Sequence, residues 1–201
     1  MKKHHIVIAV LLIALMDIYF YYQGIVLEKS YIYGEFQIIE NLQALFLVIS
    51  FTLFTLTLLF AQRGERAVVF VGMLLWLTMF LREVDFEELN VPAIVALVTV
   101  GRVKDTILGV LWFLTAVYII KNFSRYKTLI QSIVFSKLGL IVFIGGLMLL
   151  GGDLFEKMHF AHHDFYEETL ELNGYSLILF GSLFFPSFLR SLREKNRIAE
   201  S

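Results

Sequence analysis

The sequence has no cysteine and only two prolines among its 201 residues. The absence of cysteine excludes disulfide bonds, thiolate nucleophiles, Cys-ligated zinc and iron–sulfur clusters. Charged residues are also scarce, at 17%, whereas hydrophobic residues make up 58%; ordinary soluble domains have about 25% and 45–50%. A chain of this length has too little interior to bury so much apolar surface, so we expect lipid to cover it.

Six apolar segments reach or approach the roughly 20 residues that a helix needs to cross a bilayer. They lie at about residues 6–23, 36–62, 67–82, 105–121, 138–154 and 165–189. The first follows Lys2 and Lys3 as a signal peptide would, but Asp17 and several tyrosines come next, with no small-residue cleavage site. The sequence therefore predicts an all-α polytopic membrane protein, a six-helix bundle that forms a single integral membrane domain over residues 1–201.

Two shorter apolar segments do not fit this pattern. Residues 89–101 contain Pro92 and are too short to span, which favours an interfacial or re-entrant segment. Residues 124–136 mix basic and apolar side chains, which is typical of a segment lying on a membrane surface.

The distribution of charge predicts the orientation. Six spans place both termini on one side, and that side holds twelve of the 17 lysines and arginines. The positive-inside rule makes it the cytoplasmic side, so we expect a bacterial inner-membrane protein. The opposite side holds 15 of the 18 acids, although the rule does not require them there. The expected partners are the lipid bilayer, a second copy of the chain, and a cation or periplasmic protein on the outer face; nothing indicates nucleic-acid binding.

Polar residues recur near the outer end of every predicted helix. Asp17 and Glu40 lie within helices, where a charge costs about 2.5–3.5 kcal/mol and normally faces the bundle interior. We therefore predict an outward-facing polar cavity, formed by Asp17, Glu40, Asn41, Arg82, Asp153 and Glu156. The alternative, helix caps and interfacial charges, is preferred for Asp105 and Asp164.

The densest polar stretch, residues 153–171, contains three of the five histidines. His159 and His163 are four residues apart, so in a helix both imidazoles would project from one face, and Glu167 and Glu171 continue the same stripe. Imidazole and carboxylate ligands suit a divalent metal such as zinc, iron or manganese. A solvated loop or a pH-sensitive patch is the alternative.

Glycines recur in the last two predicted helices, where small residues let helix backbones approach closely in lipid. The fifth carries Gly145, Gly146 and Gly152, and the sixth carries Gly174 and Gly181. We expect these glycines to serve packing rather than chemistry.

Short motifs give two resemblances. Glu40-Asn41-x-Gln43, Leu81-Arg82-Glu83-x-Asp85 and Gly152-Asp153-Leu154-Phe155-Glu156 resemble those of a group of small bacterial multi-pass membrane proteins, which implies architecture but no activity.

The second resemblance is to the superfamily of ceramidases and progestin and adiponectin receptors. His159 and His163 match its H-x-x-x-H pair, and Glu40-Asn41 is similar to its early acidic motif. The likeness implies an embedded zinc, with Glu83 or Asp85 in place of the missing third histidine. The chain departs from the superfamily in having six predicted spans instead of seven, and its histidine pair precedes the last helix.

The sequence thus leaves several functions open. The first is an inner-membrane protein whose outer cavity binds a cation or metal. The second is a metal-dependent hydrolase acting on a lipid, with Glu83 or Asp85 as the catalytic base. The others are a proton- or cation-coupled transporter that uses Asp17 and Glu40, and a membrane sensor subunit.

Overall fold

The structure, a computed structural model, describes residues 3–33, 37–84, 86, 92, 95, 99–158 and 160–199. Helices are the only regular secondary structure in these residues, which confirms the predicted all-α class. The chain divides into two compact units. The first combines Met1–Phe46 with Ile133–Ser201, and the second is Leu47–Ser132.

All six segments that were predicted to be helical are helical. The elements in chain order are α1 (Lys3–Tyr21), the π-helical turn η1 (Tyr22–Val26), the 3₁₀ turn η2 (Ser30–Ile32), α2 (Ile38–Phe60), α3 (Arg66–Glu83), α5 (Gly101–Lys121), α6 (Phe123–Val134), α7 (Lys137–Glu156) and α8 (His163–Ala199). Helix α8 runs ten residues beyond the predicted end at 189, because the basic tail is rich in Leu, Arg, Glu and Lys, which favour helix. The prediction for residues 89–101 falls largely outside the described residues.

Five of the helical segments are long and apolar enough to cross a membrane. They are His4–Val26, Ile38–Phe60, Gly101–Lys121, Lys137–Glu156 and His163–Lys195. Helix α3 is 18 residues long but carries Arg66 at its start and Arg82 and Glu83 at its end, and it is not among the five. The described residues therefore indicate a membrane protein with five candidate spans.

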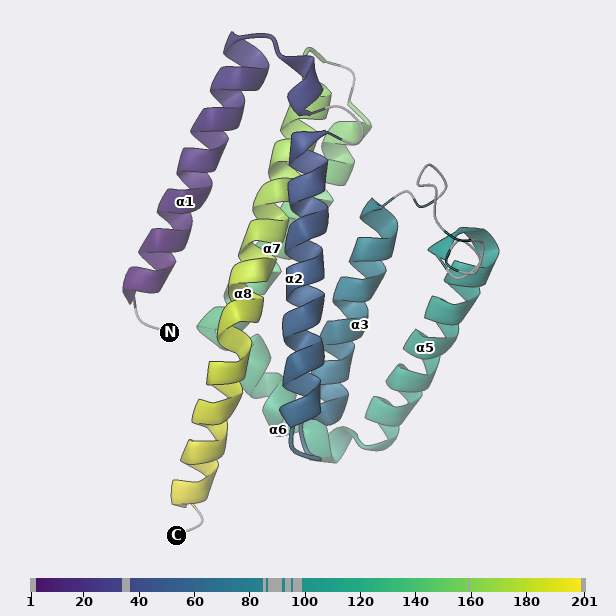
Figure 1. The fold of residues 1–201 in the computed structure, drawn as a ribbon. Helices are drawn as coiled ribbons and strands as arrows, with labels where there is room; N and C mark the ends of the chain where they lie inside the picture. Colours follow the sequence, from purple (N-terminus) through teal and green to yellow (C-terminus); the bar gives the residue numbers. More distant parts are fainter. Residues whose placement is uncertain are drawn as a thin grey trace. The chain divides into compact units, whose positions relative to one another are not determined.

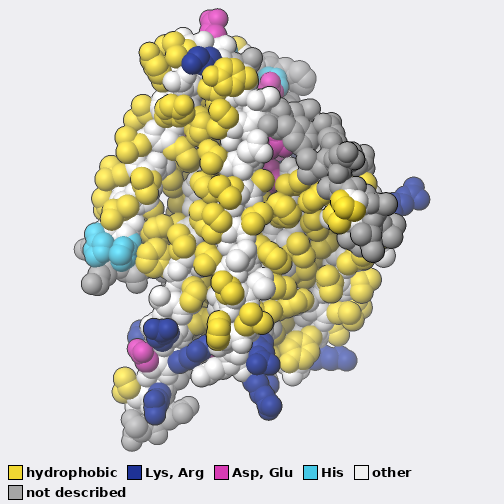
Figure 2. Space-filling view, viewed as in Figure 1, with side chains coloured by type: hydrophobic (Ala, Val, Ile, Leu, Met, Phe, Trp, Pro, Cys, Tyr) yellow, Lys and Arg dark blue, Asp and Glu magenta, His cyan; other side chains and the backbone are white. Residues whose placement is uncertain are grey.

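The apolar side chains of α1 face outward over much of its length. Leu15 and Ile18 are 63% and 65% exposed, and Leu12 of the same helix is 62% exposed. Figure 2 shows hydrophobic side chains along this helix, and Lys and Arg side chains gathered at the C-terminal end of α8. An apolar surface of this kind needs lipid or another apolar partner to cover it.

In the first unit, α7 and α8 pack side by side along their length (Figure 1). The apolar core of this unit joins the end of α1, the η2 turn, the start of α2 and the start of α8. Its buried residues are Phe20, Ile32, Ile39, Phe165 and Leu172. Helix α8 is therefore the element against which the others in this unit are placed.

In the second unit, α3 and α5 pack against each other (Figure 1). The indole Nε1 of Trp112 on α5 donates to the hydroxyl of Thr78 on α3, at 3.0 Å. Helix α6 covers most of the segment predicted to lie on the membrane surface, and it is strongly amphipathic, as an interfacial helix must be.

Candidate metal centre

The acid-rich end of α7 and the acid-rich start of α8 lie close together. Helix α7 ends at Glu156 and α8 begins at His163. His162, directly before α8, has a φ of 62°, a left-handed conformation in which His is enriched among residues other than glycine. The chain thus reverses at the point where the acid-rich end of α7 meets the acid-rich start of α8.

Three side chains in the first turn of α8 form a group that could hold a metal ion. One ligand atom each from His163, Asp164 and Glu167 all lie within 4.8 Å of one another. His163 Nδ1 lies 2.8 Å from Asp164 Oδ1. Asp164 and Glu167 are three residues apart, and His163 and Glu167 four, so helical geometry places all three near one another. His163 and Glu167 are half-buried and Asp164 is exposed, which leaves the group open to solvent on one side.

Further negative charge reaches this group from α7. Asp153 and Glu156 are close enough to Glu167 to repel it electrostatically, as Asp164 does, whereas His163 has the opposite effect. Three carboxylates from two helices, those of Asp153, Glu156 and Asp164, therefore repel the carboxylate of Glu167. Such mutual repulsion is relieved when a cation binds among the carboxylates.

The four residues predicted as metal ligands have different places in the structure. His163 and Glu167 belong to the group, and His159 lies outside the described residues. Glu171 is only 5% exposed and packs against α7 at Gly152, where an added Cβ would lie 2.6 Å from Glu171 Cγ. Asp164, which the sequence suggested was only a helix cap, is the third member of the group.

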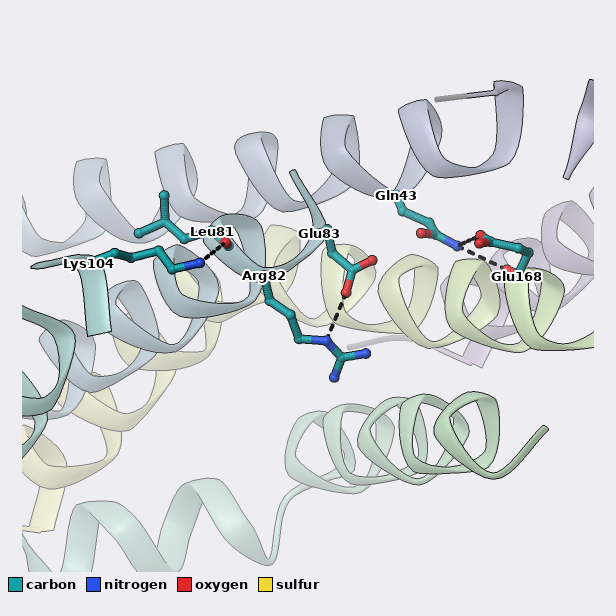
Figure 3. A network of polar contacts seen from close by, with 6 residues as sticks. All are labelled: Gln43, Leu81, Arg82, Glu83, Lys104 and Glu168. Atoms are coloured by element: carbon teal, nitrogen blue, oxygen red, sulfur yellow. Dashed lines mark hydrogen bonds and ion pairs between the residues drawn. The ribbon is translucent and has the colours of Figure 1, made fainter. Parts of the chain in front are cut away.

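Deeper along α8, two polar pairs join it to α1 and α2. Asn173 Nδ2 donates to Asp17 Oδ2 at 3.1 Å, so the charged residue in α1 faces α8. Gln43 on α2 is fully buried, and its Nε2 donates to Glu168 Oε2 at 2.8 Å and to the Glu168 carbonyl at 3.1 Å (Figure 3). Gln43, Glu168 and Asn173 were not among the residues predicted to form a site, although each lies within a turn of one that was.

The other residues predicted for the polar cavity differ in their exposure. Glu40 is half-buried in the first turn of α2, whereas Asn41 is exposed and its Nδ2 donates to the Gln37 carbonyl at 2.8 Å. Asp153 is half-buried and Glu156 exposed, both beside the metal-binding group.

The predicted catalytic residues belong to the second unit. Arg82 Nε lies 3.4 Å from Glu83 Oε1, and Lys104 Nζ donates to the Leu81 carbonyl at 3.2 Å (Figure 3). The Glu83 side chain is 8% exposed. Asp85 lies outside the described residues. Within the described part of the chain, the one group of three or more potential metal ligands is that of His163, Asp164 and Glu167.

Comparison with known proteins found no match to this chain among family models, curated proteins or solved structures.

Proposed function

We propose that this protein is a multi-pass membrane protein that binds a divalent metal ion at the start of α8. The observation that carries the proposal is the convergence of His163, Asp164 and Glu167 to within 4.8 Å of one another. One neutral imidazole nitrogen and two carboxylate oxygens form a ligand set that suits zinc, iron or manganese. The open side leaves room for water or a further ligand.

The position of the group supports a site on the outer face of the inner membrane. The α7–α8 turn is at the opposite end of α8 from the basic C-terminal tail, which the positive-inside rule assigns to the cytoplasm. If the N-terminus is cytoplasmic as well, as proposed, α3 must cross the membrane as the sixth span. Eighteen residues at 1.5 Å each give about 27 Å, close to the thickness of the hydrocarbon core.

The group supports metal binding more directly than it supports hydrolysis. The resemblance to the ceramidase and receptor superfamily implies a zinc site with three histidines, whereas this group combines one histidine with two carboxylates. Glu83, one of the two candidate bases, pairs with Arg82 in the second unit. We therefore propose a metal-binding function without assigning a reaction.

Metal analysis of the purified full-length protein tests this proposal. The affinity tag must not contain histidine, and the protein is titrated with Zn²⁺, Mn²⁺ and Fe²⁺ before elemental analysis by mass spectrometry. We expect about one ion per chain, and His163→Ala and Glu167→Gln should each weaken binding at least about tenfold, since even residues that only support metal ligands cost that much.

His162→Gly is the matched control. It removes the neighbouring imidazole, which is not part of the group, and glycine retains the left-handed backbone at that position. This variant should bind metal as the wild type does. Metal content at background in the wild type, or the same loss in His162→Gly as in His163→Ala, would show that the group is not a metal site.

A further inference from the structure

The second unit has an open cavity of about 710 Å³, far larger than a single side chain. Its walls come from the end of α2, the α2–α3 turn, the first turns of α3, the second half of α5 and the start of α6. The volume is within the usual range for small-molecule sites, about 300–1,000 Å³. Most lining residues are apolar, among them Phe70, Leu111 and Leu114.

Three arginines give this apolar cavity a positive rim. Arg63 and Arg66 come from the α2–α3 turn and the start of α3, and Arg125 from the start of α6. None of the residues lining the cavity is an acid. The acid nearest in sequence, Glu65, is 8% exposed, and its Oε2 accepts a hydrogen bond from the Gln62 amide at 3.0 Å.

The local structure holds two of these arginines in place. Arg66 Nε donates to the Ala61 carbonyl at 3.2 Å, which orients its guanidinium. The Arg125 guanidinium carbon lies 5.9 Å from the centre of the Tyr126 ring, close enough for a cation–π contact. Arg66 and Arg125 are therefore oriented before any ligand binds.

The two tyrosines of the cavity contact each other through their hydroxyl groups. Tyr126 is fully buried, and its hydroxyl donates to the hydroxyl of Tyr118 at 3.3 Å. This hydrogen bond and the burial raise the pKa of Tyr126 above its usual value near 10. The lining therefore combines three guanidinium groups with apolar side chains and contains no acid, so the cavity suits a ligand with an anionic head and an apolar body.

We propose that this cavity binds an anionic phospholipid, with the phosphate on Arg63, Arg66 and Arg125 and the start of the acyl chains against the apolar wall. Guanidinium groups pair with phosphate through parallel hydrogen bonds, and basic pockets between membrane helices recognise such headgroups. Two of the helices that build the cavity, α2 and α5, are themselves candidate spans, so a lipid beside them is within reach. A free phosphate would use the arginines but leave the apolar wall without a partner.

Native mass spectrometry of the full-length protein in detergent tests the proposal. Phosphatidylglycerol is compared with phosphatidylcholine, which has the same acyl chains but no net charge, and with glycerol 3-phosphate, which has the phosphate but no acyl chain. We expect phosphatidylglycerol to bind more tightly than either. Each of Arg63→Gln, Arg66→Gln and Arg125→Gln should weaken it about fivefold, the effect of about 1 kcal/mol for one basic residue.

Arg190→Gln is the control for general surface charge. Arg190 is an exposed arginine near the end of α8 and does not line the cavity. This variant should bind phosphatidylglycerol as the wild type does, and the melting temperature of each variant confirms that it is folded. Equal losses in Arg190→Gln and the cavity variants would overturn the proposal, as would equal affinity for phosphatidylcholine. Binding of glycerol 3-phosphate as tight as that of phosphatidylglycerol would overturn the choice of a lipid in favour of a soluble phosphate compound.

Discussion

Asp17 is a carboxylate within a candidate membrane span, a position that is stable only with a partner. Its Oδ2 accepts a hydrogen bond from Asn173 Nδ2, and Asn173 is 7% exposed. The other side-chain oxygens of the pair, Asp17 Oδ1 and Asn173 Oδ1, are buried and make no hydrogen bond within the described residues. In lipid such a pair holds two helices together because neither group has an alternative partner in the acyl chains.

We predict that Asn173→Ala destabilises the protein by about 1 kcal/mol, because it leaves the Asp17 carboxyl buried with one partner fewer. In an Asp17→Ala background the same substitution should cost much less. Unfolding of the wild type, the two single variants and the double variant in a denaturing detergent gives the coupling free energy between Asp17 and Asn173. We expect it to be about 0.6–1.7 kcal/mol. Additive effects of the two substitutions would show that the hydrogen bond does not stabilise the fold.

The sequence identified one member of this pair and two members of the metal-binding group. Asp17 was identifiable because a charge in an apolar run is rare, and His163 and Glu167 because their spacing matches one helical turn. Asn173 and Gln43 were not selected, since their importance depends on which helix faces α8, and periodicity within one helix does not contain that information. Asp164 was read as a helix cap because an acid at a helix start is favourable without any metal.

At the level of elements, the backbones of α7 and α8 approach each other closely at two glycines. A Cβ added to Gly145 would lie 2.9 Å from the Gly174 carbonyl oxygen, and one added to Gly174 would lie 2.9 Å from the Gly145 carbonyl oxygen. Gly181 likewise lies against Val142, where an added Cβ would be 2.7 Å from Cγ2. Direct contact between backbones is the packing that small residues make possible in lipid, and it positions the metal-binding group at the end of this helix pair.

Gly145→Ala and Gly146→Ala should therefore have opposite effects. At Gly145 the methyl group would press on the backbone of α8, and we expect a loss of about 1–3 kcal/mol. At Gly146 nothing lies within 4 Å of the added Cβ, so the better helix propensity of alanine should leave stability unchanged or raise it by about 0.5–1 kcal/mol. Unfolding in a denaturing detergent measures both. Equal changes at the two positions would contradict the close helix contact.

The sequence predicts the presence of the long helices, but it does not predict all of their ends. Apolar runs bounded by polar residues predicted all six long helices, because a helix satisfies the backbone hydrogen bonds of an apolar segment within that segment. By the same criterion, the last helix was predicted to end at residue 189, where the apolar run stops. Helix α8 continues to Ala199 because helix formation needs favourable side chains and not an apolar face. The glycines of α7 and α8 were predicted to serve helix packing. The contact of Gly145 with Gly174 could not be predicted, because it depends on how the two helices are placed against each other.

At the level of the whole molecule, the formal net charge of −1 hides a strong asymmetry between the ends of the helices. The interpretation of that asymmetry depends on α3, since six spans put both termini on one side and five spans put them on opposite sides. The central residues of α3 are apolar, but both of its ends carry charged residues. Its composition alone therefore does not decide whether it crosses the membrane. The proposed six-span topology, with both termini on the cytoplasmic side, therefore depends on whether α3 crosses the membrane.

The absence of cysteine makes the topology directly measurable, because each single-cysteine variant is labelled at one position and the wild type gives no background. Gln62 and Arg102 lie on either side of α3 and are exposed, as are Lys157 in the α7–α8 turn and Lys195 near the end of α8. With a membrane-impermeant maleimide on intact spheroplasts, we expect Arg102→Cys and Lys157→Cys to react, and Gln62→Cys and Lys195→Cys to react only after the membrane is opened. If Gln62→Cys and Arg102→Cys react from the same side, α3 does not cross, because the chain between the two labels then returns to the side from which it started.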